Sequence, residues 1–345
     1  MDYVEIYGPD TVLSISKRDG ELKVGQRIRF IQQQDKDDSL VKQFSSALES
    51  GVRFVLIGIP EDLGPRANHG RKGADGGWNA FLTSFVNMQH NEFLQSDKIL
   101  LLGHVKCQDL MDRTPSDVNE LRIACAELDN RVRPILQAVF ESYLIPIVIG
   151  GGHNNCYPLL SSLAYINQSK VNAINLDPHA DFRSIEDGRH SGNGFSYAYN
   201  DGILGDYHIV GLNELKNNQN SLNALHEAHF TYDSHQAIFH RRSITYKDAL
   251  LRALERISST VFGVELDTDA ISGMPVSAYN VCGVSVDLAV EYVYTCACYD
   301  NAKYLHICEA APCQHPGGYD TGVVMAGQVQ SLLVATFIQA KTGLT

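Results

Sequence analysis

"NAINLDPHADFR", residues 172–183, joins an apolar, strand-like run to three residues of types that bind metals. Asp177, His179 and Asp181 are spaced two positions apart. Alternate side chains of an extended segment point the same way, so this spacing predicts three ligands directed at one point. Pro178 cannot donate to a sheet ladder, which indicates that the chain leaves the sheet here. A solvated polar loop is the alternative interpretation.

The segments on both sides of this stretch predict an α/β fold. Apolar runs with strand character cover residues 52–59, 98–105, 144–151, 171–177, 207–213, 230–234, 260–267 and 303–309. Helical patterns cover residues 39–50, 116–142 with a kink expected at Pro134, 246–257, 283–298 and 324–341. Near-continuous apolar strands are typical of parallel sheets buried on both faces. We expect a doubly wound, three-layer domain that binds ligands beyond the carboxyl ends of its strands.

Composition excludes some classes of function and favours a location. The chain has 345 residues with a net charge of −12 and no run of Lys or Arg, which argues against binding to nucleic acid. Its first residues, "MDYVEIYGPD", lack the features of a signal peptide, and no apolar run approaches the roughly 20 residues that span a bilayer. The eight cysteines lie mostly in apolar segments, which favours buried thiols over disulfides or metal ligands. We therefore expect a cytoplasmic protein without a membrane anchor.

A second candidate site follows the run "IVIGGGHNN", residues 147–155. Its three glycines permit close backbone approach and unusual dihedral angles just before His153. A glycine-rich turn also suits phosphate binding, but the G-x-G-x-x-G spacing is absent. Taken alone, His153 is more often a hydrogen-bonded loop histidine than a metal ligand.

The third candidate is "GVELDTDAI", residues 263–271, in which Glu265, Asp267 and Asp269 alternate. On a strand they would share one face, where like charges repel unless a cation compensates them. A divalent metal is one solution, and an edge strand with a solvated acidic face is the alternative.

Together the three segments supply two imidazoles and four carboxylates, more than one ordinary metal site needs. These candidate ligands are His153, Asp177, His179, Asp181, Asp267 and Asp269. They suit two divalent ions about 3.5–4 Å apart that share carboxylates and activate one water. The donor types favour Mn²⁺, with Fe, Co, Ni and Zn as alternatives. The sequence therefore predicts metal-assisted hydrolysis.

The motifs resemble those of the ureohydrolases, the family of arginase, agmatinase and formimidoylglutamase. "GGGHNN" is similar to the family's Gly-Gly-x-His segment, "DPHAD" to Asp-Ala-His-x-Asp, and "DTD" to Ser-x-Asp-x-Asp, with Glu265 in place of Ser. They occur in the family's order over roughly residues 50–345. The resemblance implies an α/β/α sandwich with a mainly parallel sheet of about eight strands and two Mn²⁺ per chain. It makes residues 39–345 one arginase-like catalytic domain, and relatives often form trimers or hexamers. Residues 1–38 are polar and irregular in pattern, and we expect them to form an arm or edge decoration.

The resemblance also implies a role for each ligand. His153 and Asp181 would hold one ion, His179 and Asp269 the other, and Asp177 and Asp267 would bridge them. Glu309 in "HICEAAP" falls on the family's late Glu-x-x-Pro segment, which is expected to pair with a substrate amidinium or guanidinium. The alternative for Glu309 is a solvated strand end. The resemblance implies a reaction in which a metal-bridging hydroxide attacks the central carbon of the substrate's amidinium or guanidinium. The amine then leaves after it has been protonated.

Two further segments bear on the substrate. Arg183 in "HADFR" resembles the formimidoylglutamases, whereas arginases often have Asn there. An arginine suits a substrate with carboxylates, such as N-formimidoyl-L-glutamate. "PRANHGRKGA", residues 65–74, resembles the early loop of the same enzymes, with Asn68 and Arg71 as substrate contacts. A structural ion pair is the alternative for both arginines.

The segment "GRHSGNGFSYA", residues 188–198, departs from the arginases. Their proton-shuttling histidine aligns with Ser191, while His190 lies one residue earlier and could donate a proton to the leaving amine. Ser191 and Asn193 are candidates for substrate binding. We expect hydrolysis of N-formimidoyl-L-glutamate to glutamate and formamide, a reaction of histidine degradation. A guanidino ureohydrolase that releases urea and a non-catalytic metal-binding relative are the alternatives.

Overall fold

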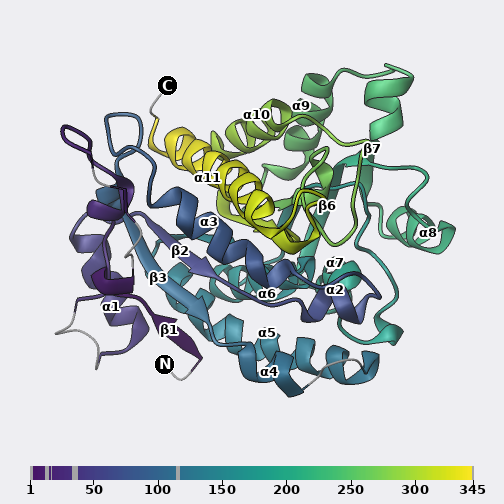
Figure 1. The fold of residues 1–345 in the computed structure, drawn as a ribbon. Helices are drawn as coiled ribbons and strands as arrows, with labels where there is room; N and C mark the ends of the chain where they lie inside the picture. Colours follow the sequence, from purple (N-terminus) through teal and green to yellow (C-terminus); the bar gives the residue numbers. More distant parts are fainter. Residues whose placement is uncertain (1–2, 12–14, 17, 33–37, 114–116, 344–345) are drawn as a thin grey trace.

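One sheet of nine strands runs through the residues that the computed structural model describes, 3–11, 15–16, 18–32, 38–113 and 117–343 (Figure 1). Their order across the sheet is β1-β3-β2-β4-β9-β8-β5-β6-β7. The strands are β1 (Val4–Ile6), β2 (Phe54–Gly58), β3 (Ile99–Val105), β4 (Ile145–Ile149), β5 (Val171–Leu176), β6 (Leu204–Leu212), β7 (Thr231–Ser234), β8 (Phe262–Asp267) and β9 (Ala302–Cys308). All neighbours pair in parallel except β1 and β3. The predicted fold class is confirmed, and each of the eight predicted strands is present.

The ninth strand, β1, comes from the N-terminal region that the sequence analysis treated as irregular. Val4 pairs with Val105 at the edge of the sheet. The hydroxyl of Tyr7 lies 2.9 Å from Nδ1 of His104 and accepts a hydrogen bond from Nε1 of Trp78 at 3.3 Å. These contacts attach the segment to the sheet. Residues 1–2, 12–14, 17 and 33–37 of the predicted arm, and residue 116 of a predicted helix, lie outside the described residues.

The five predicted helices are present, one with the predicted boundaries, 246–257, and four with boundaries shifted by one to five residues. They are α1 (Leu40–Glu49), α5 (Val118–Glu141), α9 (Tyr246–Ile257), α10 (Val286–Ala297) and α11 (Tyr319–Thr342). Helix α5 begins at the cap Asp117, whose carboxylate accepts hydrogen bonds from two backbone N–H groups, and it is continuous through Pro134. Six further helices had not been predicted: α2 (Leu63–Ala67), α3 (Gly77–Phe85), α4 (Gln108–Arg113), α6 (Cys156–Asn167), α7 (Gly194–Asn200) and α8 (Gln219–Glu227).

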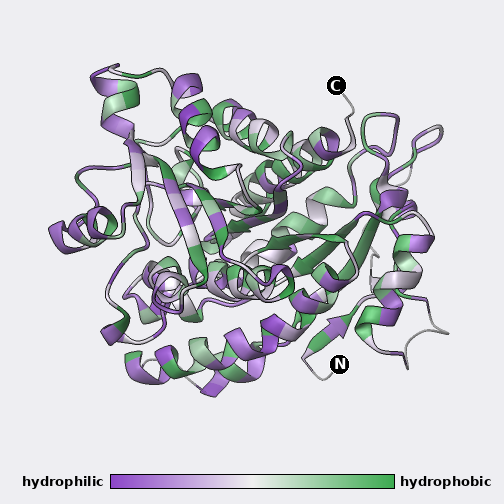
Figure 2. Cartoon of the chain, turned by 180° about the vertical axis from the view of Figure 1, so that it is seen from behind, coloured by the Kyte–Doolittle hydropathy of each residue, from purple (hydrophilic) through white to green (hydrophobic). Residues whose placement is uncertain are grey.

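Helices cover both faces of the sheet and give three layers. One apolar cluster joins the sheet to α3, α9, α10 and α11, and a second joins it to α1 and α4–α8. In β2, Phe54 and Leu56 belong to the first cluster and Val55 and Ile57 to the second, because successive side chains of a strand point to opposite faces. In Figure 2 the middle strands are largely hydrophobic, and hydrophilic residues lie on the outer sides of the helices.

Helix α11 is more apolar than the sequence analysis expected. By length and composition it is the one helix of the described chain that could cross a membrane. Of its most apolar window, 67% is buried within the protein, and the helix lies beside α3 (Figure 1). A Cβ added at Gly327 would lie 2.3 Å from the carbonyl oxygen of Ala80, so the two helices approach closely at this glycine. This burial is typical of a core helix.

Candidate metal centre and active site

Four adjacent strands position the residues of the site. β4, β9, β8 and β5 are neighbours in the sheet and run parallel, so their carboxyl ends meet at the same edge. His153 follows β4, the segment 177–181 follows β5, Asp267 ends β8, and Glu309 follows β9. Motifs that are up to 156 residues apart in the sequence therefore meet at the position where open α/β sheets bind ligands.

The glycine-rich loop after β4 is shaped by its backbone. Gly150 and Gly151 have φ angles of 91° and 72°, which a residue with a side chain adopts only with strain. A Cβ at Gly152 would lie 2.3 Å from Cδ of Pro65. A side chain at this position would therefore not fit without rearrangement. The loop therefore presents His153 to the site at the start of α6.

Glu61 holds this loop from beneath and had not been predicted. Its buried carboxylate accepts hydrogen bonds from the backbone N–H of Gly152 at 2.8 Å and from the side-chain amides of Asn154 and Asn155 at 3.1 and 2.7 Å. Burial raises the pKa of Glu61, although these hydrogen bonds lower it. The only sequence signal was an acidic residue two positions after the strand run 52–59.

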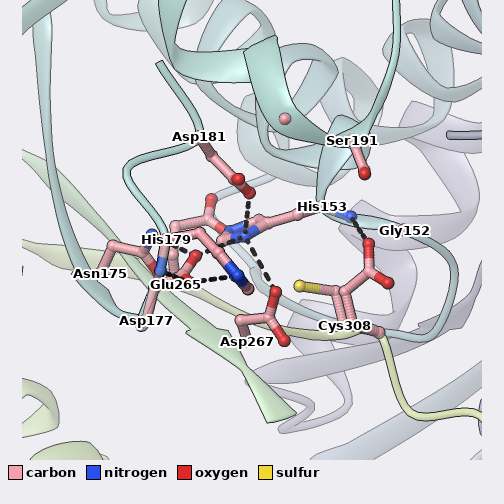
Figure 3. Close-up of polar contacts among 12 residues, drawn as sticks. Gly152, His153, Asn175, Asp177, His179, Asp181, Ser191, Glu265, Asp267 and Cys308 are labelled. Carbon is pink, nitrogen blue, oxygen red and sulfur yellow. Dashed lines mark hydrogen bonds and ion pairs between the residues drawn. The ribbon is translucent and has the colours of Figure 1, made fainter. Parts of the chain in front are cut away.

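The structure brings the six candidate ligands together in two overlapping groups. One contains His153, Asp177, Asp181 and Asp267, and the other contains Asp177, His179 and Asp269. Within each group the ligand atoms lie within 4.8 Å of one another. Figure 3 shows the carboxylates of the first group turned toward the ring of His153.

The shortest contacts link each histidine to its own carboxylates. Nδ1 of His153 lies 2.9 Å from Oδ2 of Asp181 and 3.1 Å from Oδ2 of Asp177. Nδ1 of His179 lies 3.0 Å from Oδ2 of Asp269 and 3.6 Å from Oδ1 of Asp177. Asp177 thus contacts both imidazoles with different oxygens, which is the geometry of a shared ligand.

Local backbone conformation directs two of these carboxylates. Asp269 does not extend β8, as the alternation had suggested, but lies in the short turn Thr268–Ala270, where its N–H donates to Oδ1 of Asp267 at 2.8 Å. Asp181 and Glu309 have φ angles of 45° and 65°, in the left-handed region that such residues rarely adopt. Strained conformations of this kind cluster at functional sites.

The donor atoms have the environment that divalent cations satisfy. Both ring nitrogens of His153 and Oδ1 of Asp269 are buried and lack a hydrogen-bond partner, although other carboxylates lie close by. Buried polar atoms are normally paired, and buried like charges require compensation. Four carboxylates and two imidazoles without a thiolate at the centre of the set fit hard or borderline ions such as Mn²⁺.

Protons compete with a cation for this site. Burial and the neighbouring charge of Asp177 raise the pKa of Asp181 to about 6. Burial lowers the pKa of His153, but the Cys308 thiol and the surrounding carboxylates raise it well above its ordinary value. Metal ligands must be ionised carboxylates and neutral imidazoles.

We therefore expect the affinity for Mn²⁺ to fall as the pH decreases through about 6, because Asp181 then takes up a proton. The decrease should be at least about tenfold per pH unit below that value, since one or more protons must leave when the metal binds. Calorimetric titration of the metal-free protein between about pH 5 and 8, in buffers of different ionisation enthalpy, measures both quantities. An affinity that is independent of pH over this range would contradict the expectation.

Glu265, the residue at the family's serine position, faces the site. One of its carboxylate oxygens accepts a hydrogen bond from the Tyr304 hydroxyl at 2.6 Å, and the other lies 2.6 Å from Nδ1 of His306 and 3.4 Å from Nε2 of His153. Burial raises the pKa of Glu265, but His306 and His153 lower it to about 2 overall. The residue is therefore a carboxylate that positions the His153 ring from behind, with Nδ1 left to face the aspartates.

Replacement of Glu265 by Gln is expected to weaken Mn²⁺ binding by about 10- to 100-fold, because His153 loses the carboxylate that orients it. The matched control is Glu186→Gln, on the exposed turn Ile185–Asp187, which should leave the affinity unchanged. Metal titration measures the effect, and circular dichroism tests whether the variant is folded. An unchanged affinity in a folded Glu265→Gln protein would show that the carboxylate has no positioning role.

A cavity of about 200 Å³ opens above the candidate ligands. Its lining includes the buried or half-buried residues His179, Asp181, Asp267, Asp269 and Glu309, which form its floor. The predicted substrate residues Asn68, Arg183 and Ser191 also line it. The cavity therefore combines a negative floor with the exposed cation of Arg183, which lies at its more exposed part, the rim.

Glu309 is fixed at the floor of this cavity. Its Oε1 accepts a hydrogen bond from the backbone N–H of His153 at 3.0 Å, and its Oε2 accepts one from the Ser277 hydroxyl at 2.7 Å. Burial and the charge of Asp267 raise the pKa of Glu309 well above its ordinary value. A cationic group in the cavity would favour its ionised form.

Three predicted residues do not face the cavity. Arg71 donates to the backbone carbonyls of Ser277 and Val276 at 2.9 and 3.1 Å, so it supports a loop and is not available as the expected second anion contact. Asn193 donates to two backbone carbonyls and accepts from Arg189 and from the N–H of His190, so its polar groups serve the loop itself.

His190 is also unsuited to the expected proton transfer. Its side chain is 1% exposed, and its Nδ1 accepts a hydrogen bond from the backbone N–H of Gly192. Burial and nearby arginine side chains lower the pKa of His190 to about 3, so the ring is neutral at physiological pH. Both properties depend on tertiary packing, which the sequence pattern did not reveal.

Six other residues with polar side chains line the cavity without having been predicted. They are His69, Lys216, Asn217, Asn218, Ser221 and Ser277. His69 stood inside the quoted segment 65–74, between the two residues that were selected, and Lys216 and Asn217 follow the strand run 207–213. For Ser277, no neighbouring motif gave a signal.

Comparison with known proteins agrees with this geometry. The family model described as "Arginase family" matches residues 52–335. The formimidoylglutamase of Streptococcus gordonii is 29% identical over 258 residues, which is 70% of this chain and 71% of that protein. Among solved structures, formimidoylglutamase from Bacillus subtilis matches with a TM-score of 0.73 and 16% identity, covering 96% of this chain and 95% of that one. Trypanosoma cruzi formiminoglutamase with Mn²⁺ matches with a TM-score of 0.69 and 17% identity, covering 93% and 98%.

The family match extends over all four strands that carry the candidate site and over the loops that follow them. The two solved structures share the fold of this chain. On the strength of the family match, the chain belongs to the arginase family.

Proposed function

We propose that this protein hydrolyses N-formimidoyl-L-glutamate to glutamate and formamide. The observation that carries the proposal is the charge distribution of the cavity, with Glu309 at the floor and Arg183 and Lys216 at the rim. An amidinium at one end of a substrate and carboxylates at the other complement this arrangement. The names of the formimidoylglutamase relatives support the same substrate.

The metal assignment is part of this proposal. His153 and Asp181 would hold one Mn²⁺, His179 and Asp269 the other, and Asp177 and Asp267 would bridge the two. The contacts of Asp177 with both histidines support a bridging role, and the Mn²⁺ named with the Trypanosoma cruzi structure supports the choice of metal. When bound, such a pair of ions supplies Lewis acidity and a water that is nucleophilic near neutral pH.

The side chains of the cavity would bind and orient the substrate. Glu309 would pair with the amidinium, since a planar N–C–N cation donates two parallel hydrogen bonds to a carboxylate. Arg183 and Lys216 would bind the substrate carboxylates, and Asn68 and Ser191 would supply polar contacts between the two ends. This placement would hold the amidine carbon above the aspartates. Holding the reacting groups close together in this way raises the rate of the reaction.

A direct test compares two substrates with one preparation of the protein. The Mn²⁺-loaded protein should release formamide from N-formimidoyl-L-glutamate and release little or no urea from L-arginine or agmatine. Formamide and urea are measured in parallel at equal substrate concentrations. Release of urea at the higher specificity constant would assign a guanidino substrate, and no hydrolysis of either class would overturn the proposed activity.

Arg183→Ala is expected to raise KM for N-formimidoyl-L-glutamate by about 10- to 100-fold, because a charge-assisted hydrogen bond to a carboxylate is lost. Arg183→Lys should recover only part of the loss, since an ammonium lacks the planar fork. Arg53→Ala is the control, because this exposed arginine directly precedes β2. It therefore lies at the amino ends of the strands, whereas the site lies at their carboxyl ends. An unchanged KM in Arg183→Ala would exclude contact between this residue and the substrate.

We also propose a cytoplasmic location and assembly into a homo-oligomer, a trimer or hexamer. The eight cysteines are all free, and five of them are buried, which suits a reducing compartment. Light scattering of the purified protein measures the oligomeric state.

A further inference from the structure

A second group of metal-ligand side chains lies outside the six residues of the candidate centre. His235 precedes the π-helical turn Gln236–His240 that follows β7, His240 is the last residue of that turn, and Cys282 lies in the loop 271–284 before α10. The potential ligand atoms of these three residues lie within 4.8 Å of one another. π-Helical turns are rare and frequently occur at functional sites.

The distances within this group match those of ligands on one ion. Sγ of Cys282 lies 3.9 Å from Nδ1 of His235 and 3.8 Å from Nε2 of His240. Zn–S bonds of about 2.3 Å and Zn–N bonds of about 2.0–2.1 Å at tetrahedral angles place sulfur and nitrogen about 3.6 Å apart. A thiol has one proton and accepts hydrogen bonds weakly, so it is a weak hydrogen-bond partner for two imidazoles.

The surroundings hold the ring of His235 in place. Its side chain is buried, with 6% exposure, and the ring packs against Phe239 at a centroid distance of 4.7 Å and against His240 at 5.2 Å. A hydrogen bond also links the ring to the backbone of Gly283. Histidines that bind metals commonly use their second nitrogen in this way.

We propose that His235, His240 and Cys282 bind a borderline divalent cation of the Zn²⁺ class, separate from the pair of ions in the active site. Two imidazoles and a thiolate supply three of four tetrahedral positions, and solvent can reach the fourth because His240 is exposed. The ion would join the segment after β7 to the loop 271–284. It is therefore a structural site with one open position.

This ion would stabilise a loop that contributes to the active site. Within the loop 271–284, Ser277 donates a hydrogen bond to Glu309, and Asn280 donates one to the backbone carbonyl of Asp269 at 2.9 Å. Cys282 lies two residues beyond Asn280, so an ion there would anchor the end of the loop that precedes α10. Removal of the ion is expected to loosen the contact between Ser277 and Glu309.

Cobalt tests the site by a signal that the six ligands of the active-site pair do not give. Co²⁺ bound to a thiolate absorbs strongly in the near ultraviolet, whereas the six active-site ligands contain no sulfur. The metal-free full chain titrated with Co²⁺ should bind about three ions per chain and develop this charge-transfer band. Cys282→Ser should lose the band and one ion, and His240→Ala, at an exposed position, should lose at least about 90% of the band intensity while the chain stays folded.

Two controls separate this site from the active site. Cys298→Ser removes an exposed thiol outside the cluster and should keep the band. Asp177→Asn, which alters only the active-site pair, should also keep it, so the two proposals can fail independently. Absence of the band from the unmodified protein, or its persistence in Cys282→Ser, would overturn the proposed site. Addition of Zn²⁺ should abolish the cobalt band by displacement, and a band unaffected by excess Zn²⁺ would overturn the assignment to the Zn²⁺ class.

Discussion

Replacement of Asp177 by Asn is expected to abolish turnover, with a loss of more than about 10³-fold in kcat. Asp177 is completely buried and contacts the imidazoles of both His153 and His179. It also accepts a hydrogen bond from the side-chain amide of Asn175 at 3.0 Å. The asparagine keeps the size of the side chain but removes the charge that two cations would share. Turnover at saturating Mn²⁺ and the metal content after dialysis measure the effect.

The matched control is Asp206→Asn, which removes a partly exposed carboxylate that pairs with Arg256 far from the site. Surface ion pairs contribute little, so this variant should keep its activity and metal content. Circular dichroism of Asp177→Asn establishes whether the loss reflects unfolding. A folded Asp177→Asn protein that retains two ions and normal turnover would contradict the bridging role.

Glu309→Gln is expected to lower kcat/KM for N-formimidoyl-L-glutamate by about 10²- to 10³-fold, because loss of one partner of a buried charge pair costs about 2–5 kcal/mol. The backbone N–H of His153 and the Ser277 hydroxyl fix the two oxygens of Glu309, so the amide nitrogen of Gln would face a donor. The metal content should stay unchanged, which distinguishes this effect from that of Asp177→Asn. Steady-state kinetics and metal analysis of the same preparation provide the measurement.

Ser277→Ala is a milder change at the same contact, and it is compared with Glu309→Gln. It removes one of the two hydrogen bonds to Glu309 but keeps the charge, so the loss should be about tenfold. If Glu309→Gln and Ser277→Ala had equal effects, the charge of Glu309 would have no separate role in substrate binding.

The sequence predicted the strands and the six candidate ligands because both depend on local pattern. Apolar runs end in ligand residues at 153, 177 and 267, and the carboxyl ends of parallel strands meet. The helices that had not been predicted include α6, "CYPLLSSLAYIN", which is apolar around most of its surface and therefore lacks the period of an amphipathic helix. The edge strand β1 has only three residues, too few for a pattern.

The direction of polar side chains could not be predicted. Arg71 and Asn193 have the types expected of substrate contacts, yet both bind backbone carbonyls of neighbouring loops. Glu61 supports the loop of His153 by binding Gly152, which is 91 positions away in the sequence. Ser277 contacts Glu309, which is 32 positions away. Such contacts arise from tertiary packing, for which one sequence contains no periodic signal.

The order of the strands has a consequence for biosynthesis. β8 and β9, the last two strands to leave the ribosome, insert between β4 and β5 in the middle of the sheet. The residues before β8, up to residue 261, therefore cannot close the sheet, and neither Asp267 nor Glu309 is yet available to the site. Long-range insertions of this kind fold slowly. A nascent chain that is stalled before β8 should depend on chaperones and remain without activity until β8 and β9 have been synthesised.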